Sequence, residues 1–221
     1  MRLAIFAVIL FFFSCNHSDN KTVVVSGKFV NAPEVVVYLE MIGADDQPQV
    51  VDSVSMKGGV FELKANTTEE SLLQIRFPDA KSSPFIFLAS DNKKIKLTGD
   101  WNDFSRLRFE GSPASERLRL FLDSLASVQQ EMMAIDQSAT AQADSTAKLK
   151  ALQTYQDKIS QTNQYIRSVA EKDESPVVSL FAASLMSQSG KVEEIEIVMN
   201  GLKKKFPRHA WVNKVVEQFR T

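Results

Sequence analysis

Hydrophobic and polar residues alternate on both sides of a glycine pair in the first half of the chain. In the stretch Val50–Leu63, VVDSVSMKGGVFEL, the turn lies at Lys57-Gly58-Gly59, and the paired glycines supply the positive φ angles that a tight β-hairpin turn needs. Period-two alternation places apolar side chains on one face and polar ones on the other, as a half-buried antiparallel sheet requires. The predicted apolar face holds Val54, Met56, Phe61 and Leu63.

Similar runs before and after this stretch predict about eight strands between residues 22 and 112. Most alternate, whereas Phe85–Ala89 is a continuous apolar run, typical of a strand buried on both faces. Met41–Gln49 carries glycine, proline and two aspartates, which predicts a loop. Short connections between strands favour an antiparallel β-sandwich or half-barrel. The other predicted strands are Thr22–Val30, Glu34–Glu40, Ser71–Phe77, Pro84–Ser90, Lys94–Thr98 and Phe104–Glu110.

Apolar residues then recur every three or four positions, which predicts helices from residue 113 to residue 221. Ser112 is a plausible N-cap with Pro113 in the first turn, and Ser115 is the competing cap. Two long amphipathic helices joined by a connector over Asp136–Ala147 predict an antiparallel hairpin. Polar residues near its seam, Gln156 and Asn163, indicate a loosely packed or elongated hairpin. Three shorter helices follow over Val177–Gln188, Val192–Phe206 and Ala210–Phe219.

The predicted fold class is therefore α+β, an antiparallel β domain over residues 22–112 followed by a helical region over 113–221. The helical region combines the long hairpin with the three short helices. Periodicity alone does not decide whether it docks on the sheet or stands apart.

The N-terminus has the pattern of a secretory signal. Arg2 precedes Leu3–Phe13, an apolar run of eleven residues that is too short to span a bilayer, and Ser14-Cys15 follows. This resembles a lipoprotein signal peptide over residues 1–14, with Cys15 becoming the acylated first residue of a tether over 15–21. The alternative is an ordinary secretory signal with an incidental cysteine. The expected location is the cell envelope, lipid-anchored at the periplasmic face of the outer membrane or at the cell surface.

Composition narrows the chemistry that the chain could perform. The formal charge of −1 gives no general case for nucleic-acid binding. One cysteine and two histidines exclude an internal disulfide, a Cys-x-x-Cys motif and a zinc cluster. We find no paired nucleophile and base, no metal site and no cofactor motif, so we expect no catalytic residues.

Four basic residues alternate with apolar ones on two predicted neighbouring strands, Lys94 and Lys96 on the first and Arg106 and Arg108 on the second. Together they could bind an anionic glycan or lipid head group. The alternative is a solvated strand face, in which lysines protect a sheet edge from aggregation.

Four segments resemble a known family: GKFVNAPEVVVYLE, VVDSVSMKGGVFEL, FLASDNKKIKLTGD and FEGSPASERLRLFLDSL. They look like the domain of unknown function, number 4369 in its series, of Bacteroidota envelope lipoproteins, and the likeness covers roughly residues 22–125. In that family the domain often precedes a thioredoxin-like domain of thiol–disulfide interchange proteins. The resemblance implies an envelope location and a β fold. The sequence through Thr221 contains no thioredoxin-like domain, so no redox residue carries over.

The expected function is a lipid-anchored binding or scaffolding module without catalysis. The membrane is reached through the lipid on Cys15, and the partner is an envelope protein or an anionic glycan or lipid. One alternative is an accessory partner of a separate thiol–disulfide enzyme. Another is an unrecognised envelope hydrolase, which would require a deep pocket with converging acids.

Overall fold

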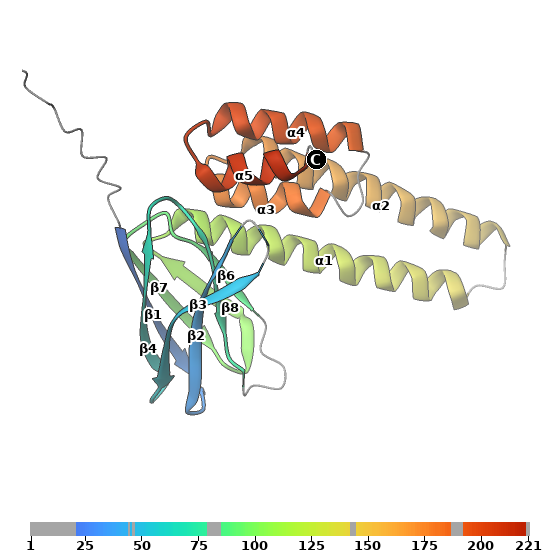
Figure 1. Ribbon diagram of the computed structural model, residues 1–221. Coiled ribbons are helices and arrows are strands. Elements are labelled where there is room, and N and C mark those ends of the chain that lie inside the picture. The colour runs from blue at the N-terminus through green and yellow to red at the C-terminus, as the bar shows by residue number, and fades with distance from the viewer. Residues whose placement is uncertain are drawn as a thin grey trace, which may run out of the picture.

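The computed structural model describes residues 21–43, 45, 47–78, 85–141, 145–186 and 192–219. A β domain carries a helical region along one side, and two long helices project from the body (Figure 1). The predicted signal peptide over 1–14, the acylation site Cys15 and the tether up to residue 20 lie outside the described residues.

Eight strands in the described part of the chain form two four-stranded sheets, in the orders β4-β1-β7-β8 and β3-β2-β5-β6. The predicted loop over Met41–Gln49 is shorter than expected, because β2 runs on through Ile42 and β3 begins at Pro48. The strands are β1 (Lys21–Val30), β2 (Val35–Ile42), β3 (Pro48–Met56), β4 (Val60–Thr67), β5 (Leu72–Arg76), β6 (Ile86–Ala89), β7 (Lys94–Asp100) and β8 (Asp103–Glu110).

One strand pair departs from the predicted antiparallel pattern. β1 and β7 run parallel, with Val24 opposite Lys94 and Gly27 opposite Leu97. Between these strands the chain crosses to the second sheet and returns twice, and a long crossover of this kind allows parallel pairing. The first sheet is therefore mixed, and the second is antiparallel throughout.

The predicted hairpin forms its turn but not a paired ladder. Gly58 and Gly59 have φ angles of +58° and +76°, and Lys57 pairs with Val60 across the turn. Beyond that bridge the two strands enter different sheets, so the turn is a corner of the sandwich. The Asp52 carboxylate spans this corner and accepts hydrogen bonds from the backbone N–H of Ser53 (2.8 Å) and of Lys64 (2.7 Å).

The predicted division of the hairpin into an apolar and a polar face is confirmed. Met56, Phe61 and Leu63 are at most 4% exposed, whereas the serines and charged residues between them face water. These side chains join a core between the two sheets that ends in a cluster of aromatic rings. Its members are Phe29, Phe61, Phe77, Trp101 and Phe104, with neighbouring ring centroids 5.1–6.5 Å apart.

The helices follow the sequence prediction except at the hairpin connector. The predicted connector Asp136–Ala147 is mostly helical, because alanine and glutamine favour helix strongly enough to outweigh the serines and threonines. No helix in the described ranges is long and apolar enough to cross a bilayer. The helices are α1 (Pro113–Ala141), α2 (Ser145–Lys172), α3 (Pro176–Met186), α4 (Val192–Lys205) and α5 (Ala210–Phe219).

The helical region docks on the outer face of the sheet β3-β2-β5-β6, which answers the question that periodicity left open. Leu72 of β5 and Ala89 of β6 lie in one buried cluster with Leu118 of α1 and with residues of α3, α4 and α5. Strand β6 is covered on both sides, as predicted, since Ile86 and Leu88 point into the sandwich core. Its neighbour Phe85 is the exception and is 55% exposed.

Candidate functional site

The connection between β4 and β5 lies against the start of two helices and fixes the docking. The Glu69 carboxylate accepts hydrogen bonds from the backbone N–H of Ala210 (2.7 Å) and of Trp211 (2.9 Å), and so caps the N-terminus of α5. His209 Nε2 lies 2.8 Å from the carbonyl oxygen of Glu70. The place of His209 after Pro207, at the start of a helix, predicts a surface residue; the structure shows that this prediction is wrong, since the side chain is 9% exposed and belongs to this junction.

Serines complete the junction at α1 and α3. Ser112 is the N-cap of α1, because its Oγ accepts the N–H of Ser115 at 3.1 Å. Ser115 is not the cap; its hydroxyl accepts the N–H of Ala89 in β6 at 2.9 Å. Ser175 caps α3 by accepting the N–H of Val178, and its hydroxyl donates to the Glu70 carboxylate.

Burial raises the pKa of the Glu70 carboxyl above its ordinary value; the Ser175 hydrogen bond opposes the rise and the nearby Asp91 carboxylate adds to it. An acid whose pKa is raised by folding stabilises the fold fully below the unfolded pKa of about 4.3 and loses that contribution as the pH rises through the folded pKa. We therefore expect Glu70→Gln to melt above the wild type at pH 7, with the difference disappearing near pH 4.

Thermal melts of both proteins across this pH range measure the effect. Glu110→Gln, on the exposed face of β8, is the control and should change the melting temperature little at any pH. A Glu70→Gln protein that melts below the wild type by the same amount at every pH would contradict the prediction.

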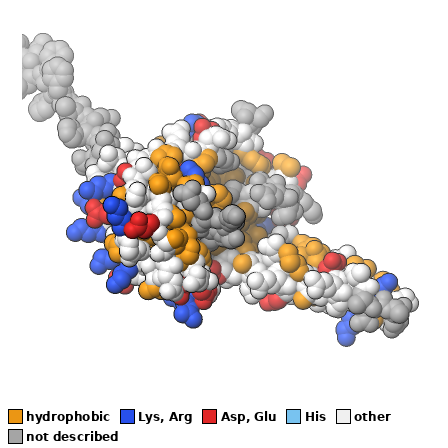
Figure 2. All heavy atoms as spheres, turned by 90° about the horizontal axis from the view of Figure 1, so that it is seen from below, with side chains coloured by type: hydrophobic (Ala, Val, Ile, Leu, Met, Phe, Trp, Pro, Cys, Tyr) orange, Lys and Arg blue, Asp and Glu red, His pale blue; other side chains and the backbone are white. Residues whose placement is uncertain are grey.

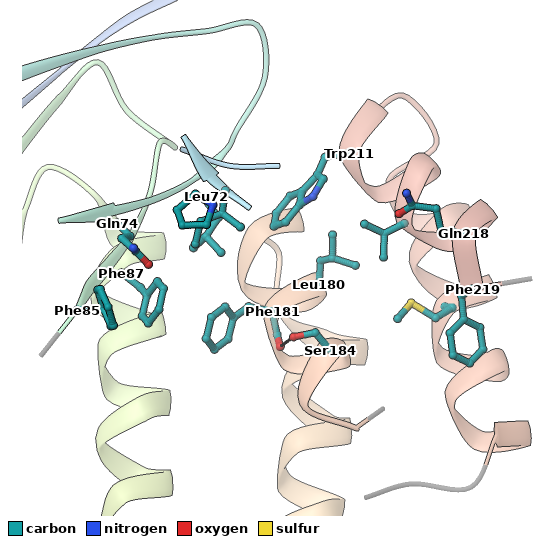
Figure 3. A pocket seen from close by; sticks show the side chains of 14 residues that line it. Leu72, Gln74, Phe85, Phe87, Leu180, Phe181, Ser184, Trp211, Gln218 and Phe219 are labelled. Atoms are coloured by element: carbon teal, nitrogen blue, oxygen red, sulfur yellow. Dashed lines mark hydrogen bonds between the residues drawn. The ribbon is translucent and has the colours of Figure 1, made fainter. Parts of the chain in front are cut away.

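Beside the junction, the sheet and the helices enclose an apolar cleft of about 660 Å³. One wall is formed by β2, β5, β6 and the start of β3, and the other by α3, α4 and α5. Figure 3 shows Phe87 between Phe85 and Phe181, with Trp211 and Phe219 farther along the helical wall. The ring centroids of Phe87 and Phe181 are 5.4 Å apart, so aromatic rings connect the two walls.

The cleft has few polar groups. The indole Nε1 of Trp211 is buried away from the cleft space and has no hydrogen-bond partner among the described residues. A buried donor without a partner is uncommon, because losing its hydrogen bonds to water costs about 1–3 kcal/mol. Within the lining that the structure describes there is no aspartate, glutamate or histidine. The cleft is therefore suited to holding a mainly apolar molecule.

A buried carboxylate lies behind the polar edge of the cleft. Glu40 of β2 is 3% exposed, and its Oε2 accepts a hydrogen bond from Gln74 Nε2, a cleft-lining amide, at 2.5 Å. Its Oε1 accepts from Arg76 Nε at 2.7 Å, with Arg76 Nη2 at 2.6 Å. The Arg76 guanidinium stacks over the Tyr38 ring, with 4.7 Å between the guanidinium carbon and the ring centroid. This network fixes the position of the Gln74 amide at the cleft wall.

The four basic residues singled out in the sequence share one exposed face of the sheet β4-β1-β7-β8, on the neighbouring strands β7 and β8. Figure 2 shows lysine and arginine side chains gathered on one side of the β domain, with acidic ones among them. Arg106 Nε lies 3.0 Å from Asp103 Oδ2, and Arg108 Nη1 donates to the carbonyl of Leu107. Lys94 and Lys96 extend from β7 on the same face. The arginines thus have intramolecular partners, and the face carries mixed charge.

Sequence reasoning did not find the cleft. In the sequence, Trp211 is as consistent with a packing anchor as with a ligand platform, and Phe87 and Phe181 lie in apolar runs that indicate core. Glu40 was assigned only to a strand. The one sequence signal was that Glu40, Gln74 and Arg76 all fall on the polar face of predicted strands. No group of three or more His, Cys, Asp or Glu residues that could hold a metal ion occurs in the portion of the chain covered by the structure.

Comparison with known families identifies the N-terminal part. Residues 23–118 match the family model described as "Domain of unknown function (DUF4369)". The match runs from β1 into the first turns of α1 and confirms the predicted resemblance to that domain. No protein with a curated description matches the chain.

Proposed function

We propose that the protein is a lipid-anchored binding module of the cell envelope, and that the cleft beside Trp211 holds its ligand. The ligand class that fits is a hydrocarbon chain, such as that of a fatty acid or its ester. The volume and the aromatic lining of the cleft carry this proposal.

The size and lining of the cleft support a small-molecule ligand. Ligand sites typically have volumes of about 300–1,000 Å³ and are mostly apolar, with a few polar groups that orient the ligand. The cleft of about 660 Å³ lies within this range, and Phe87, Phe181 and Trp211 supply rigid apolar walls.

The test is to fill the cleft and, separately, to remove the donor. Val215 lines the cleft, so Val215→Trp should reduce the affinity for dodecanoate and for methyl dodecanoate at least tenfold by occupying the space. Val192→Trp is the matched control, because Val192 is 68% exposed on α4 and does not line the cleft. Calorimetric titration of the full chain measures both. Equal affinities for the two variants would contradict the proposal.

A variant without the indole donor tests whether the apolar walls alone set the affinity. Trp211→Phe keeps most of the apolar wall, and the Nε1 that it lacks is buried away from the cleft, so dodecanoate and dodecyltrimethylammonium should each bind this variant as tightly as they bind the wild type. A loss of affinity confined to dodecanoate would mean that the indole N–H reaches the ligand.

The lipid anchor belongs to the same proposal and rests on the sequence, since Cys15 lies outside the described residues. Metabolic labelling with a palmitate analogue should mark the wild-type chain and not Cys15→Ala. The variant should also leave the membrane fraction. A labelled Cys15→Ala chain would contradict the anchor but leave the cleft proposal intact.

The two alternative functions differ from this proposal in what they require. An accessory to a thiol–disulfide enzyme should co-purify with a thioredoxin-like partner, and its deletion should lower that partner's activity. An envelope hydrolase needs converging acids, and the described lining of the cleft contains none, so the cleft gives that alternative no support.

A further inference from the structure

The outer parts of α1 and α2 form an arm that projects from the body (Figure 1). We define the arm as residues 122–141 and 145–165. None of its described side chains is buried, whereas Phe121 and Ile166, at its base, are 2% and 7% exposed. A pair of helices can bury only the side chains along the line where the helices touch, which we call the seam. The arm is therefore held together by this narrow contact alone.

The seam does not use the most apolar stripe of α2. The half-buried α2 residues that face α1 are mostly small or polar. On another side of α2, residues spaced alternately three and four positions apart form a stripe of the kind that packs in helix bundles. The two leucines and the isoleucine of this stripe that lie farthest from the body are 38–68% exposed. The seam residues are Ala147, Ala151, Tyr155, Lys158 and Thr162. The stripe consists of Leu149, Leu152, Gln156, Ile159, Asn163, Ile166 and Ala170.

The inner end of this stripe is already covered within the chain. Ile166 and Ala170 are buried in the same cluster as Val177 and Val178 of α3, which packs against α2. Beyond the half-buried Asn163, the stripe continues outward through the exposed Ile159, Leu152 and Leu149. The arm therefore carries the extension of an existing helix–helix interface.

A groove on the arm opens on the same side. It has a volume of about 420 Å³ and is lined by Met133 and Asp136 of α1 and by Tyr155 of α2, among others. Met133 is 54% exposed. Tyr155 is one helical turn from both Leu152 and Ile159, so the groove and the stripe form one apolar face.

We infer that the arm of a second copy of this chain covers this face, so that two arms form a four-helix bundle. Opposite charges favour a second copy, since a two-fold axis can place Asp136 on α1 of one arm beside Lys148 on α2 of the other. Gln156 interrupts the stripe near its middle, and one polar position in such a seam fixes the register and the number of helices. The described α1 part of the arm carries Asp123, Glu131 and Asp136 and no lysine or arginine; the described α2 part carries Lys148, Lys150 and Lys158 with Asp157. Of these, Glu131 and Lys158 already form an ion pair within the chain.

Sedimentation of the full chain in excess detergent tests the inference. The wild type should be a dimer in the micromolar range. Leu152→Glu with Ile159→Glu should weaken association at least tenfold and leave the helix content unchanged, because both side chains are exposed in the single chain. The matched control is Val192→Glu with Ile197→Glu, two apolar residues of α4 that are 68% and 60% exposed outside the arm.

A charge swap tests the arrangement. Lys148→Glu should weaken the dimer at low salt, and adding Asp136→Lys should restore part of the loss. A wild-type chain that stays monomeric at 100 μM, or a stripe variant that dimerises as well as the control, would overturn the inference. Loss of ligand binding in the cleft would not affect it, because no arm residue lines the cleft.

Discussion

Arg76→Met should lower the free energy of unfolding by about 3 kcal/mol, because it leaves the buried Glu40 carboxylate without its cation. Breaking a buried ion pair from one side typically costs about 3–5 kcal/mol. The lower end applies because the Arg76 side chain is 33% exposed and water can enter the space it leaves. For a chain of this length the melting temperature should fall by roughly 6–12 °C. Thermal and urea denaturation measure the change.

Two further variants separate the charge effect from lost packing. Glu40→Gln in the Arg76→Met background should recover most of the stability, because an amide is far less costly to bury than a carboxylate without its partner. Arg106→Met removes an arginine that is 71% exposed and paired at the surface, and it should change stability by less than about 1 kcal/mol. If Arg76→Met lowers the free energy of unfolding as little as Arg106→Met does, the buried Glu40 carboxylate does not need the Arg76 cation, and the prediction is wrong.

The features that depend on neighbouring residues could be predicted from the sequence. The alternation around Gly58-Gly59 identified the buried side chains of β3 and β4, and the Ser112-Pro113 pair identified the start of α1. Both signals are local, because side-chain period and helix capping involve residues only a few positions apart. The predicted α+β order, a β domain and then helices, is confirmed for the same reason.

The pairing of the strands could not be predicted in this way. The turn at Lys57–Val60 predicts two strands that pair with each other, but β4 pairs with β1 and β3 pairs with β2. Which partner is chosen depends on the combined burial of both sheet faces, including the ring cluster around Phe77. Asp52 shows the consequence, because its carboxylate takes the N–H of Lys64 that a hairpin ladder would have used.

The candidate site was also beyond sequence reasoning, because its walls come from distant segments. Phe87 and Phe181 are in contact although they are 94 positions apart in the sequence. A tryptophan among apolar neighbours predicts core, and only the docked helices show that the Trp211 indole N–H is buried without a partner. Similarly, Leu149 and Leu152 recur at helical spacing, which predicts one apolar stripe, but the structure leaves this stripe exposed beside the hairpin seam.

Gly59→Ala should destabilise the fold by about 3 kcal/mol, which combines the penalty for an L-residue at positive φ with a steric clash. An added Cβ would lie 2.0 Å from the carbonyl oxygen of Phe29, and this backbone atom is held in place by neighbouring strands. The Gly59 carbonyl also accepts a hydrogen bond from the N–H of Phe29 at 2.8 Å, so the turn cannot move away without losing it. Urea denaturation of the purified chain measures the loss.

The adjacent glycine is the matched control. Gly58 also has a positive φ, +58°, but an added Cβ there would meet no atom within 4 Å. Gly58→Ala should therefore lower the free energy of unfolding only by the cost of placing an L-residue at positive φ, about 1 kcal/mol. The difference between the two alanine variants isolates the contact of the turn with β1, because both place the same residue in the same turn. Equal losses would mean that the corner between the two sheets moves freely relative to Phe29, and that the turn does not lock the sheets together.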